Sequence, residues 1–319
     1  ALLLAAPSLH DGSSVASSVG ACGTGRRVVA AAWAAAAGAL GSPASSSCVE
    51  LPTELVLDAR AAGRPFGSGE LTFHRGTELQ FFEAIQAAGR DSRAGSDAAE
   101  TVLRAADDFC WHKQWMMNIG DVKGEILDAA LRDRIGTWSS EAISAPGSTF
   151  HALELGTYVG YSAVRIARLL PPGGVLYSAD PDPIWQSVAD KVLDASGLRA
   201  RVELMEETAE VASSALASRG VALDFVFVDH EKKDYLPALL RLERLGLLRP
   251  GCTVVADNVY VFEVSDYLSH MRDSGKFKSR YVDAEVEYTP LQNYLSVDSE
   301  GRPLSRAVRD GVEVSVYVP

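Results

Sequence analysis

The sequence predicts an α/β fold in which a mostly parallel, twisted, Rossmann-like sheet is covered by helices on both faces. Two observations lead to this prediction. Short apolar or β-branched segments alternate with segments of helical periodicity along the middle of the chain, which is typical of βαβ units. The end of the chain instead carries two segments that alternate at period two, which predicts an antiparallel strand pair at the sheet edge.

Three helices are expected before the first strand. Residues 77–89 and 97–113 place apolar side chains at intervals of three and four, and a Gly/Ser-rich linker separates them. Residues 124–135 continue the same periodicity. This part of the chain therefore predicts a helical layer that precedes the sheet.

Five parallel strands are expected next, at residues 151–155, 174–178, 201–205, 224–229 and 252–257. The helices between and after them should begin near Tyr161, Pro183, Thr208, Tyr235 and Val264. Residues 279–288 and 311–318 form the expected antiparallel pair.

The composition limits the classes of partner. With 319 residues, 47% of them hydrophobic, the chain can bury the core of one large domain with an extension. A net charge of −12 opposes binding to nucleic acid, and a membrane surface is not expected for the domain either. Four irregularly spaced cysteines indicate neither a disulfide framework nor a zinc site, which favours an intracellular, reducing compartment.

The first 50 residues differ from the rest in being rich in Ala, Ser and Gly. We predict a low-complexity leader over residues 1–65 and a folded domain over residues 66–319. Residues 28–40 form an apolar run behind two arginines, shorter than the ~20 residues that span a bilayer. The leader is either a segment that targets an organelle such as a plastid or a disordered tail, and both interpretations stay open.

The loop after the first strand combines a carboxylate with glycines. Glu154 precedes Gly156, and Gly160 opens the next helix. Glycines let the backbone turn tightly and approach a ligand, but the dinucleotide pattern G-x-G-x-x-G is not met. A carboxylate here would repel a pyrophosphate and suit the ammonium of an amino-acid moiety beside a sulfonium. The loop therefore favours S-adenosylmethionine over NAD, with a plain strand-to-helix turn as the alternative.

An acid also follows the second strand. Asp180 lies 24 residues after Gly156, at the position where an acid typically accepts hydrogen bonds from both ribose hydroxyls of a nucleoside. The alternative role is a helix cap ahead of Pro183, which fits Asp182 better than Asp180.

Oxygen-bearing side chains follow the fourth and fifth strands. Asp229 ends one strand, and Asp257 with Asn258 ends the other. Two carboxylates and one amide oxygen, with positions left for water or substrate, suit Mg²⁺. Either motif alone is better explained as a cap or a turn, but both together predict a magnesium site.

Four segments of the chain resemble the catechol O-methyltransferase family: "WMMNIGDVKG", "LELGTYVGYSAVRIARLLPPG", "FVFVDHEKKDYLPALLRLERLGLLRPG" and "VVADNVYV". The resemblance runs from about Gly76 to the carboxyl terminus, roughly three quarters of the chain. It implies a Rossmann-like class I methyltransferase fold. It also implies an enzyme that moves the methyl group of S-adenosylmethionine to one hydroxyl of a magnesium-bound catechol or related diphenol.

The resemblance implies roles for individual residues. It implies contacts to the cofactor from Met117, Asn118, Ile119, Glu154, Gly156, Tyr158, Ser162, Asp180, Asp229 and His230. The implied metal ligands are Asp229, Asp257 and Asn258, and the implied substrate contacts are Trp115, Lys123, Asn258, Phe262 and Glu287. Lys232 matches the general base, and Glu287 matches the acid that hydrogen-bonds the second hydroxyl of the substrate.

The sequence departs from the family pattern on the adenine side and near the substrate. Glu231 stands where the family has a tryptophan, Glu210 where it has a glutamine and Ala209 where it has a serine. Phe262 replaces a proline of the substrate wall. The insertion at residues 289–309 could cover the pocket or bind a protein partner.

Two alternative functions come from other classes. A non-catalytic scaffold that keeps the cofactor site would explain the changed adenine side. An NAD-dependent oxidoreductase is disfavoured by Glu154 and by the missing second glycine.

Overall fold

The computed structural model describes residues 77–91, 95–144, 148–262, 264–288 and 309–319. The predicted leader at residues 1–65 and all but the last residue of the predicted insertion at 289–309 lie outside these ranges. Apart from Tyr288, the described residues belong to one structural unit. None of their helices is both long and apolar enough to cross a membrane.

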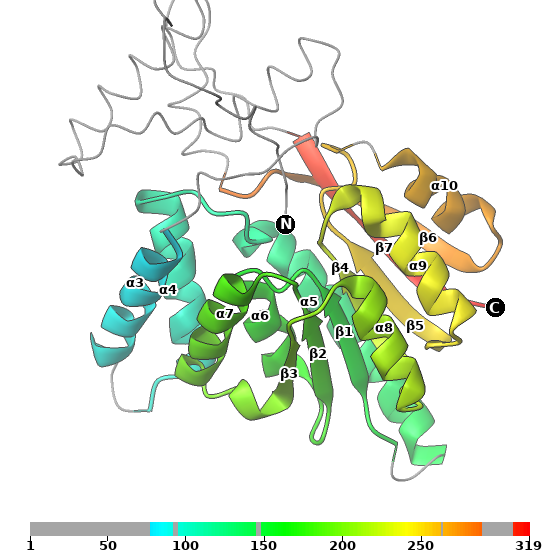
Figure 1. Ribbon diagram of the computed structural model, residues 1–319, viewed down its shortest axis with the longest axis horizontal. Helices are drawn as coiled ribbons and strands as arrows, with labels where there is room; N and C mark the ends of the chain where they lie inside the picture. The colour runs from blue at the N-terminus through cyan, green and yellow to red at the C-terminus, as the bar shows by residue number, and fades with distance from the viewer. Residues whose placement is uncertain (1–76, 92–94, 145–147, 263, 289–308) are drawn as a thin grey trace, which may run out of the picture. The chain divides into compact units, whose positions relative to one another are not determined.

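A seven-stranded sheet with the order β3-β2-β1-β4-β5-β7-β6 forms the centre of this unit (Figure 1). The five parallel strands are β1 (His151–Leu155), β2 (Val175–Ala179), β3 (Val202–Met205), β4 (Leu223–Val228) and β5 (Leu248–Ala256). Strands β6 (Phe277–Glu285) and β7 (Arg309–Tyr317) pair antiparallel with each other, and β7 pairs antiparallel with β5. The predicted fold class is thus confirmed, including the antiparallel carboxyl-terminal pair.

Eight α-helices occur in the described ranges: α3 (Thr77–Asp91), α4 (Ala98–His112), α5 (Gly120–Ser144), α6 (Tyr161–Leu169), α7 (Pro183–Ala195), α8 (Ala209–Ser218), α9 (Tyr235–Arg244) and α10 (Ser265–Asp273). The helices form two groups. Helices α8, α9 and α10 pack their apolar side chains on one face of the sheet. The second group contains α5, α6 and α7, and α3 and α4 pack against α6 and α7 (Figure 1).

The helix starts follow from capping residues. Asp182 accepts hydrogen bonds from the backbone N–H groups of Ile184 and Trp185, and Pro183 takes the first helical position of α7. Asp234 takes the corresponding position before α9, but its side chain makes no capping bond within the described structure. A single 3₁₀ turn, Lys232–Asp234, leads into the helix instead.

Helix α5 is fixed to the sheet by buried charges at two places along its length. In the middle of the helix, Arg134 pairs with Asp224 of β4 at 3.0 Å, and both side chains are buried. Near its start, the Lys123 ammonium meets carboxylates at the opposite edge of the sheet. Buried charges are tolerated only when they are paired, so these contacts fix how α5 lies on the sheet.

Candidate active site

The register of the parallel strands brings four predicted residues to one edge. Leu155, the last residue of β1, is level with Ala179 of β2 and with Val228 of β4, which in turn is level with Ala256 of β5. The residues that follow these four positions are Gly156, Asp180, Asp229 and Asp257. The strand order reverses between β1 and β4, where open α/β sheets bind their ligands.

Gly156 lets the loops after β1 and β4 touch. Its φ of 103° lies in the left-handed region, and a Cβ atom built on it would lie 2.2 Å from the carbonyl oxygen of Asp229. Only glycine fits such a close approach of two backbones. The loop that carries a proposed cofactor contact therefore lies against the loop that carries a proposed metal ligand.

Changing Gly156 to Ala should lower the free energy of unfolding by about 2–5 kcal/mol, because backbone strain and a backbone clash add. Gly173→Ala is the matched control, since Gly173 also has a positive φ, of 77°, but no described atom within 4 Å of its Cβ position. The control should lose only about 1 kcal/mol. Chemical denaturation of both variants measures the difference, and equal losses would show that the contact with Asp229 is unimportant.

Asp180 is held by the backbone on both sides. Its Oδ2 atom accepts a hydrogen bond from the N–H of Tyr158 at 3.0 Å, and its Oδ1 atom accepts one from the N–H of Asp182 at 3.0 Å. Burial raises the pKa of this carboxyl, while the two N–H donors oppose the shift. Each oxygen keeps a lone pair that can accept a ribose hydroxyl.

Tyr158 lies beside this carboxylate with a positive φ of 46°. Its ring packs edge-on against Trp185 of α7, with 5.0 Å between the ring centroids. A non-glycine residue in this conformation stores strain, which is common at ligand-binding sites.

Glu154 is completely buried near the end of β1. Its Oε2 atom accepts a hydrogen bond from the Ser178 hydroxyl at 2.5 Å, whereas its Oε1 atom accepts none from the residues that the structure describes. Burial raises the pKa of Glu154 to about 8, although the hydroxyls of Ser162 and Ser178 oppose the shift. A buried carboxylate with one unpaired oxygen suits a ligand that brings a positive charge and N–H donors.

The predicted metal ligands have the right atoms available. Asp257 is buried, and its Oδ1 atom has no hydrogen-bond partner among the described residues. Burial raises the pKa of Asp257 well above its usual range, and the neighbouring carboxylates of Asp229, Asp310 and Glu287 raise it further. His, Cys, Asp and Glu side chains form no three-ligand cluster in the described ranges, so an amide oxygen from Asn258 would have to complete the set.

Lys232 lies next to the first of these ligands. Its Nζ atom is 2.7 Å from Oδ1 of Asp229 and 2.6 Å from the hydroxyl of Tyr235. The ammonium also lies 5.4 Å from the centre of the Phe262 ring. The Lys232 side chain is 11% exposed and Asp229 is 15% exposed, so an acceptor that enters from solvent could reach both.

Lys123 lies beside three carboxylates, two of which belong to predicted site residues. Its side chain is fully buried, and its Nζ atom contacts Asp257 at 2.9 Å, Glu287 at 2.8 Å and Asp310 at 2.9 Å. Burial disfavours the charge of Lys123, but the three carboxylates outweigh burial and raise its pKa well above its usual value. The ammonium donates hydrogen bonds to Asp257 and Asp310 and forms an ion pair with Glu287, and the side chain is buried.

Asp310 is the residue that sequence reasoning missed. It lies near the start of β7, is fully buried, and accepts hydrogen bonds from Lys123 and Asn258. The available signal was an acid followed by Gly311 at the start of an apolar alternating segment. Its position depends on how β7 pairs with β5, which local pattern does not reveal.

The charges at this edge do not balance. With all of these groups ionised, four carboxylates face the two ammonium groups of Lys123 and Lys232, which leaves a formal balance of −2. The carboxylates belong to Asp229, Asp257, Glu287 and Asp310. A divalent cation would neutralise this excess, and burying it without a counter-ion would be costly.

The remaining predicted residues are buried or half-buried. Trp115 donates from its indole N–H to the carbonyl oxygen of Glu287 at 3.0 Å. The side-chain amide nitrogen of Asn118 donates to the sulfur of Cys110 in α4 at 3.4 Å. Ile119 and Ser162 are buried and Met117 is half-buried.

Three residues predicted to lie on the adenine side, His230, Glu231 and Glu210, have different surroundings. The ring of His230 stacks on Tyr235 at 5.3 Å, and burial lowers the pKa of His230 to about 3, so the imidazole is neutral. Glu231 has a buried oxygen without a hydrogen bond in the described structure. Glu210 is exposed and pairs with Arg241. Of these three positions, only His230 and Glu231 offer unpaired buried atoms to a ligand.

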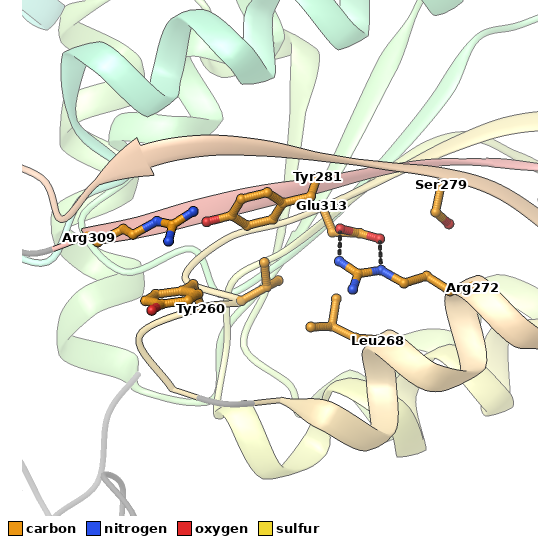
Figure 2. A pocket seen from close by; sticks show the side chains of 8 residues that line it. Tyr260, Leu268, Arg272, Ser279, Tyr281, Arg309 and Glu313 are labelled. Atoms are coloured by element: carbon orange, nitrogen blue, oxygen red, sulfur yellow. Dashed lines mark hydrogen bonds and ion pairs between the residues drawn. The ribbon is translucent and has the colours of Figure 1, made fainter. Parts of the chain in front are cut away.

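A separate cavity of about 400 Å³ lies beside α10, β6 and β7 (Figure 2). Its lining residues are Val259, Tyr260, Leu268, Arg272, Ser279, Tyr281, Arg309 and Glu313. None of the residues predicted for the cofactor, metal or substrate is among them. The charged side chains that line this cavity are all ion-paired: Arg272 with Glu313, and Arg309 with Asp283 outside the lining. They therefore offer no unpaired charge to a ligand.

Comparisons with known proteins identify what shares this arrangement. Residues 147–278 match the O-methyltransferase family. The chain is 39% identical over 198 residues to catechol O-methyltransferase B of Danio rerio, covering 61% of this chain and 70% of that protein. It is 36% identical over 217 residues to the probable O-methyltransferase Rv1703c of Mycobacterium tuberculosis, covering 66% and 87%.

Solved structures support the fold. The O-methyltransferase TomG of Streptomyces achromogenes, determined in complex with SAM, aligns with a TM-score of 0.51 at 19% identity. The alignment covers 76% of this chain and 99% of that one. At this level of identity the likeness shows the fold alone.

Proposed function

The chain belongs to the catechol O-methyltransferase family of S-adenosylmethionine-dependent O-methyltransferases, and from this premise we propose that its methyl acceptor is a magnesium-bound catechol-type diphenol. One observation carries the proposal. At a single sheet edge, a lysine stands 2.7 Å from one carboxylate while a second, buried carboxylate keeps an unpaired oxygen. Such an edge can hold a metal-bound hydroxyl next to a base.

The residues present fit a magnesium ion. Asp229, Asp257 and Asn258 would hold it through hard oxygen atoms, and its charge would match the excess of −2 at this edge. When bound, Mg²⁺ lowers the pKa of a coordinated hydroxyl and orients the two oxygens of a 1,2-diphenol.

The protein groups perform the remaining tasks. In its neutral amine form, Lys232 would accept the proton of the attacking hydroxyl. Glu287 would accept a hydrogen bond from the second hydroxyl. Phe262 and Trp115 would supply apolar surface for the flat ring, which favours an approach free of water.

We propose that the cofactor lies along the ends of β1 and β2. Glu154 would pair with its ammonium, and Asp180 would accept hydrogen bonds from its ribose hydroxyls. The acceptor oxygen can then displace the neutral thioether in line, since both partners are held on neighbouring loops.

The substrate class is tested by comparing the three dihydroxybenzene isomers at saturating Mg²⁺ with labelled S-adenosylmethionine. Only the 1,2-isomer can bring both oxygens to one metal ion, so it should be methylated far faster than the 1,3- and 1,4-isomers. Equal rates for all three isomers would contradict the proposed chelation while leaving O-methyl transfer itself intact.

Four further predictions stay proposals. They are the domain boundary at residue 65, a targeting role of the leader toward an organelle, a protein-binding role of residues 289–309, and an intracellular location of the protein. Imaging of the protein with and without residues 1–65 would test the leader.

A further inference from the structure

We propose that Asp310 is a positioning residue that turns the Asn258 amide so that its oxygen, and not its nitrogen, faces the metal. This inference rests on the proposed magnesium site. It assigns a task to a side chain that would not contact the metal, the cofactor or the substrate itself.

The hydrogen bonds of Asp310 determine the orientation of the amide. Its Oδ2 atom accepts from Nδ2 of Asn258 at 2.8 Å and from Nζ of Lys123 at 2.9 Å. The same oxygen thus receives N–H donors from two side chains, and the Lys123 ammonium can offer nothing but donors to it. A flipped amide would point its oxygen at this carboxylate and lose a charge-assisted bond.

Asp310 and its neighbour also fasten the loop that carries Asn258. The Oδ1 atom of Asp310 accepts from the N–H of Val261 at 3.2 Å, and the carbonyl oxygen of Gly311 accepts from the N–H of Val259 at 3.2 Å. Asn258 itself has a positive φ of 54°, a conformation that needs support from its surroundings. Three bonds from two residues of β7 thus hold the 258–261 loop.

The backbone of Asp310 is fixed from the other face of β7. The hydroxyl of Tyr281 donates to the carbonyl oxygen of Asp310 at 2.7 Å. A Cβ atom on Gly311 would lie 2.3 Å from the Tyr281 ring, so the glycine makes room for this contact. Figure 2 shows Tyr281 on the side of β7 that carries Glu313. The Asp310 carboxylate is therefore presented to the site by a rigid strand.

Lys123 links Asp310 to a second proposed ligand. Its Nζ atom also contacts Oδ2 of Asp257, which leaves the Oδ1 atom as the unpaired oxygen of that carboxylate. Asp310 and Lys123 together thus determine which atoms of Asp257 and Asn258 remain for the metal. Mutation of residues that hydrogen-bond metal ligands in this way typically lowers metal affinity about 10–100-fold.

The test measures binding of Mn²⁺, as a probe for Mg²⁺, by the loss of the free-ion electron paramagnetic resonance signal. Asp310→Asn should weaken Mn²⁺ binding about 10–100-fold, because the new side chain can offer a donor where an acceptor is needed. Binding of S-adenosylmethionine, measured by calorimetry without metal, should change little. Unaltered Mn²⁺ affinity in Asp310→Asn would overturn the inference.

Glu313→Gln is the matched control. Glu313 is also a fully buried carboxylate of β7, but it accepts two bonds from Arg272 of α10 (Figure 2). Among the described residues, its side chain makes no hydrogen bond with Asp229, Asp257 or Asn258. This variant should lose stability while its Mn²⁺ affinity stays close to that of the wild type. An equal loss of affinity in both variants would reduce Asp310 to a structural role.

Exchanging the side chains of Asn258 and Asp310 tests whether the orientation of the metal-facing oxygen matters separately from the charge at position 310. The double variant Asn258→Asp with Asp310→Asn again places a donor opposite an acceptor and leaves a carboxylate oxygen for the metal. It should bind Mn²⁺ within about tenfold of the wild type, a non-additive result typical of direct partners. A folded exchange variant as weak as Asp310→Asn would refute the inference even if the single variant failed to fold. A wild-type protein that does not bind Mn²⁺ would instead refute the magnesium site.

Discussion

Replacing Lys232 by methionine is expected to lower kcat for methyl transfer by about 10²–10⁴-fold, the usual contribution of a general base. Methionine keeps much of the length of the side chain and its contact with Phe262, but it cannot accept a proton. The Nζ atom it removes is 2.7 Å from Asp229, where the acceptor hydroxyl would be bound. Stopped assays with labelled S-adenosylmethionine would measure the loss.

Lys233→Met is the control for this change, because Lys233 is the adjacent lysine and is exposed. It should retain kcat within a few-fold of the wild type, and both variants should bind the cofactor normally. A Lys232→Met enzyme with nearly full kcat would exclude this side chain as the base.

Replacing Glu154 by glutamine should weaken cofactor binding by about 10²–10³-fold, since it leaves a buried ammonium without its counter-charge. In the absence of cofactor, the same substitution should instead increase the free energy of unfolding at high pH. Folded Glu154 has a pKa of about 8, above the usual 4.5, so between these values the folded state holds a proton that the unfolded state has released. The free energy of unfolding contributed by this group therefore falls as pH rises toward 8.

Glutamine removes that pH dependence, so Glu154→Gln without cofactor should gain stability relative to the wild type as pH rises. Thermal unfolding of both proteins at pH 5 and pH 8, with and without S-adenosylmethionine, measures both effects. A variant that binds the cofactor as tightly as the wild type would remove Glu154 from the site.

Much of the fold could be predicted because its signals are local. Helix α7 begins at Pro183 behind the Asp182 cap, and the buried strands read as short apolar segments. The parallel register then brings the residues after β1, β2, β4 and β5 to one edge, so the positions of Asp180, Asp229 and Asp257 followed from strand order alone.

The parts of the site that depend on distant pairing could not be predicted. Asp310 approaches Asn258 only because β7 pairs antiparallel with β5, in a register that brings Glu313 opposite Ala256. The ion pairs of Lys123 with three carboxylates likewise depend on how α5 packs on the sheet, which the local sequence pattern does not reveal.

The most direct test of the account is the dependence of methyl transfer to 1,2-dihydroxybenzene on magnesium. Chelation of divalent ions should abolish transfer of the labelled methyl group, and added Mg²⁺ should restore it. Calorimetry should find the same cofactor affinity in both states. Transfer that persists after complete chelation would contradict the metal site. Tight cofactor binding with no transfer to any diphenol would contradict the proposed acceptor and favour a scaffold.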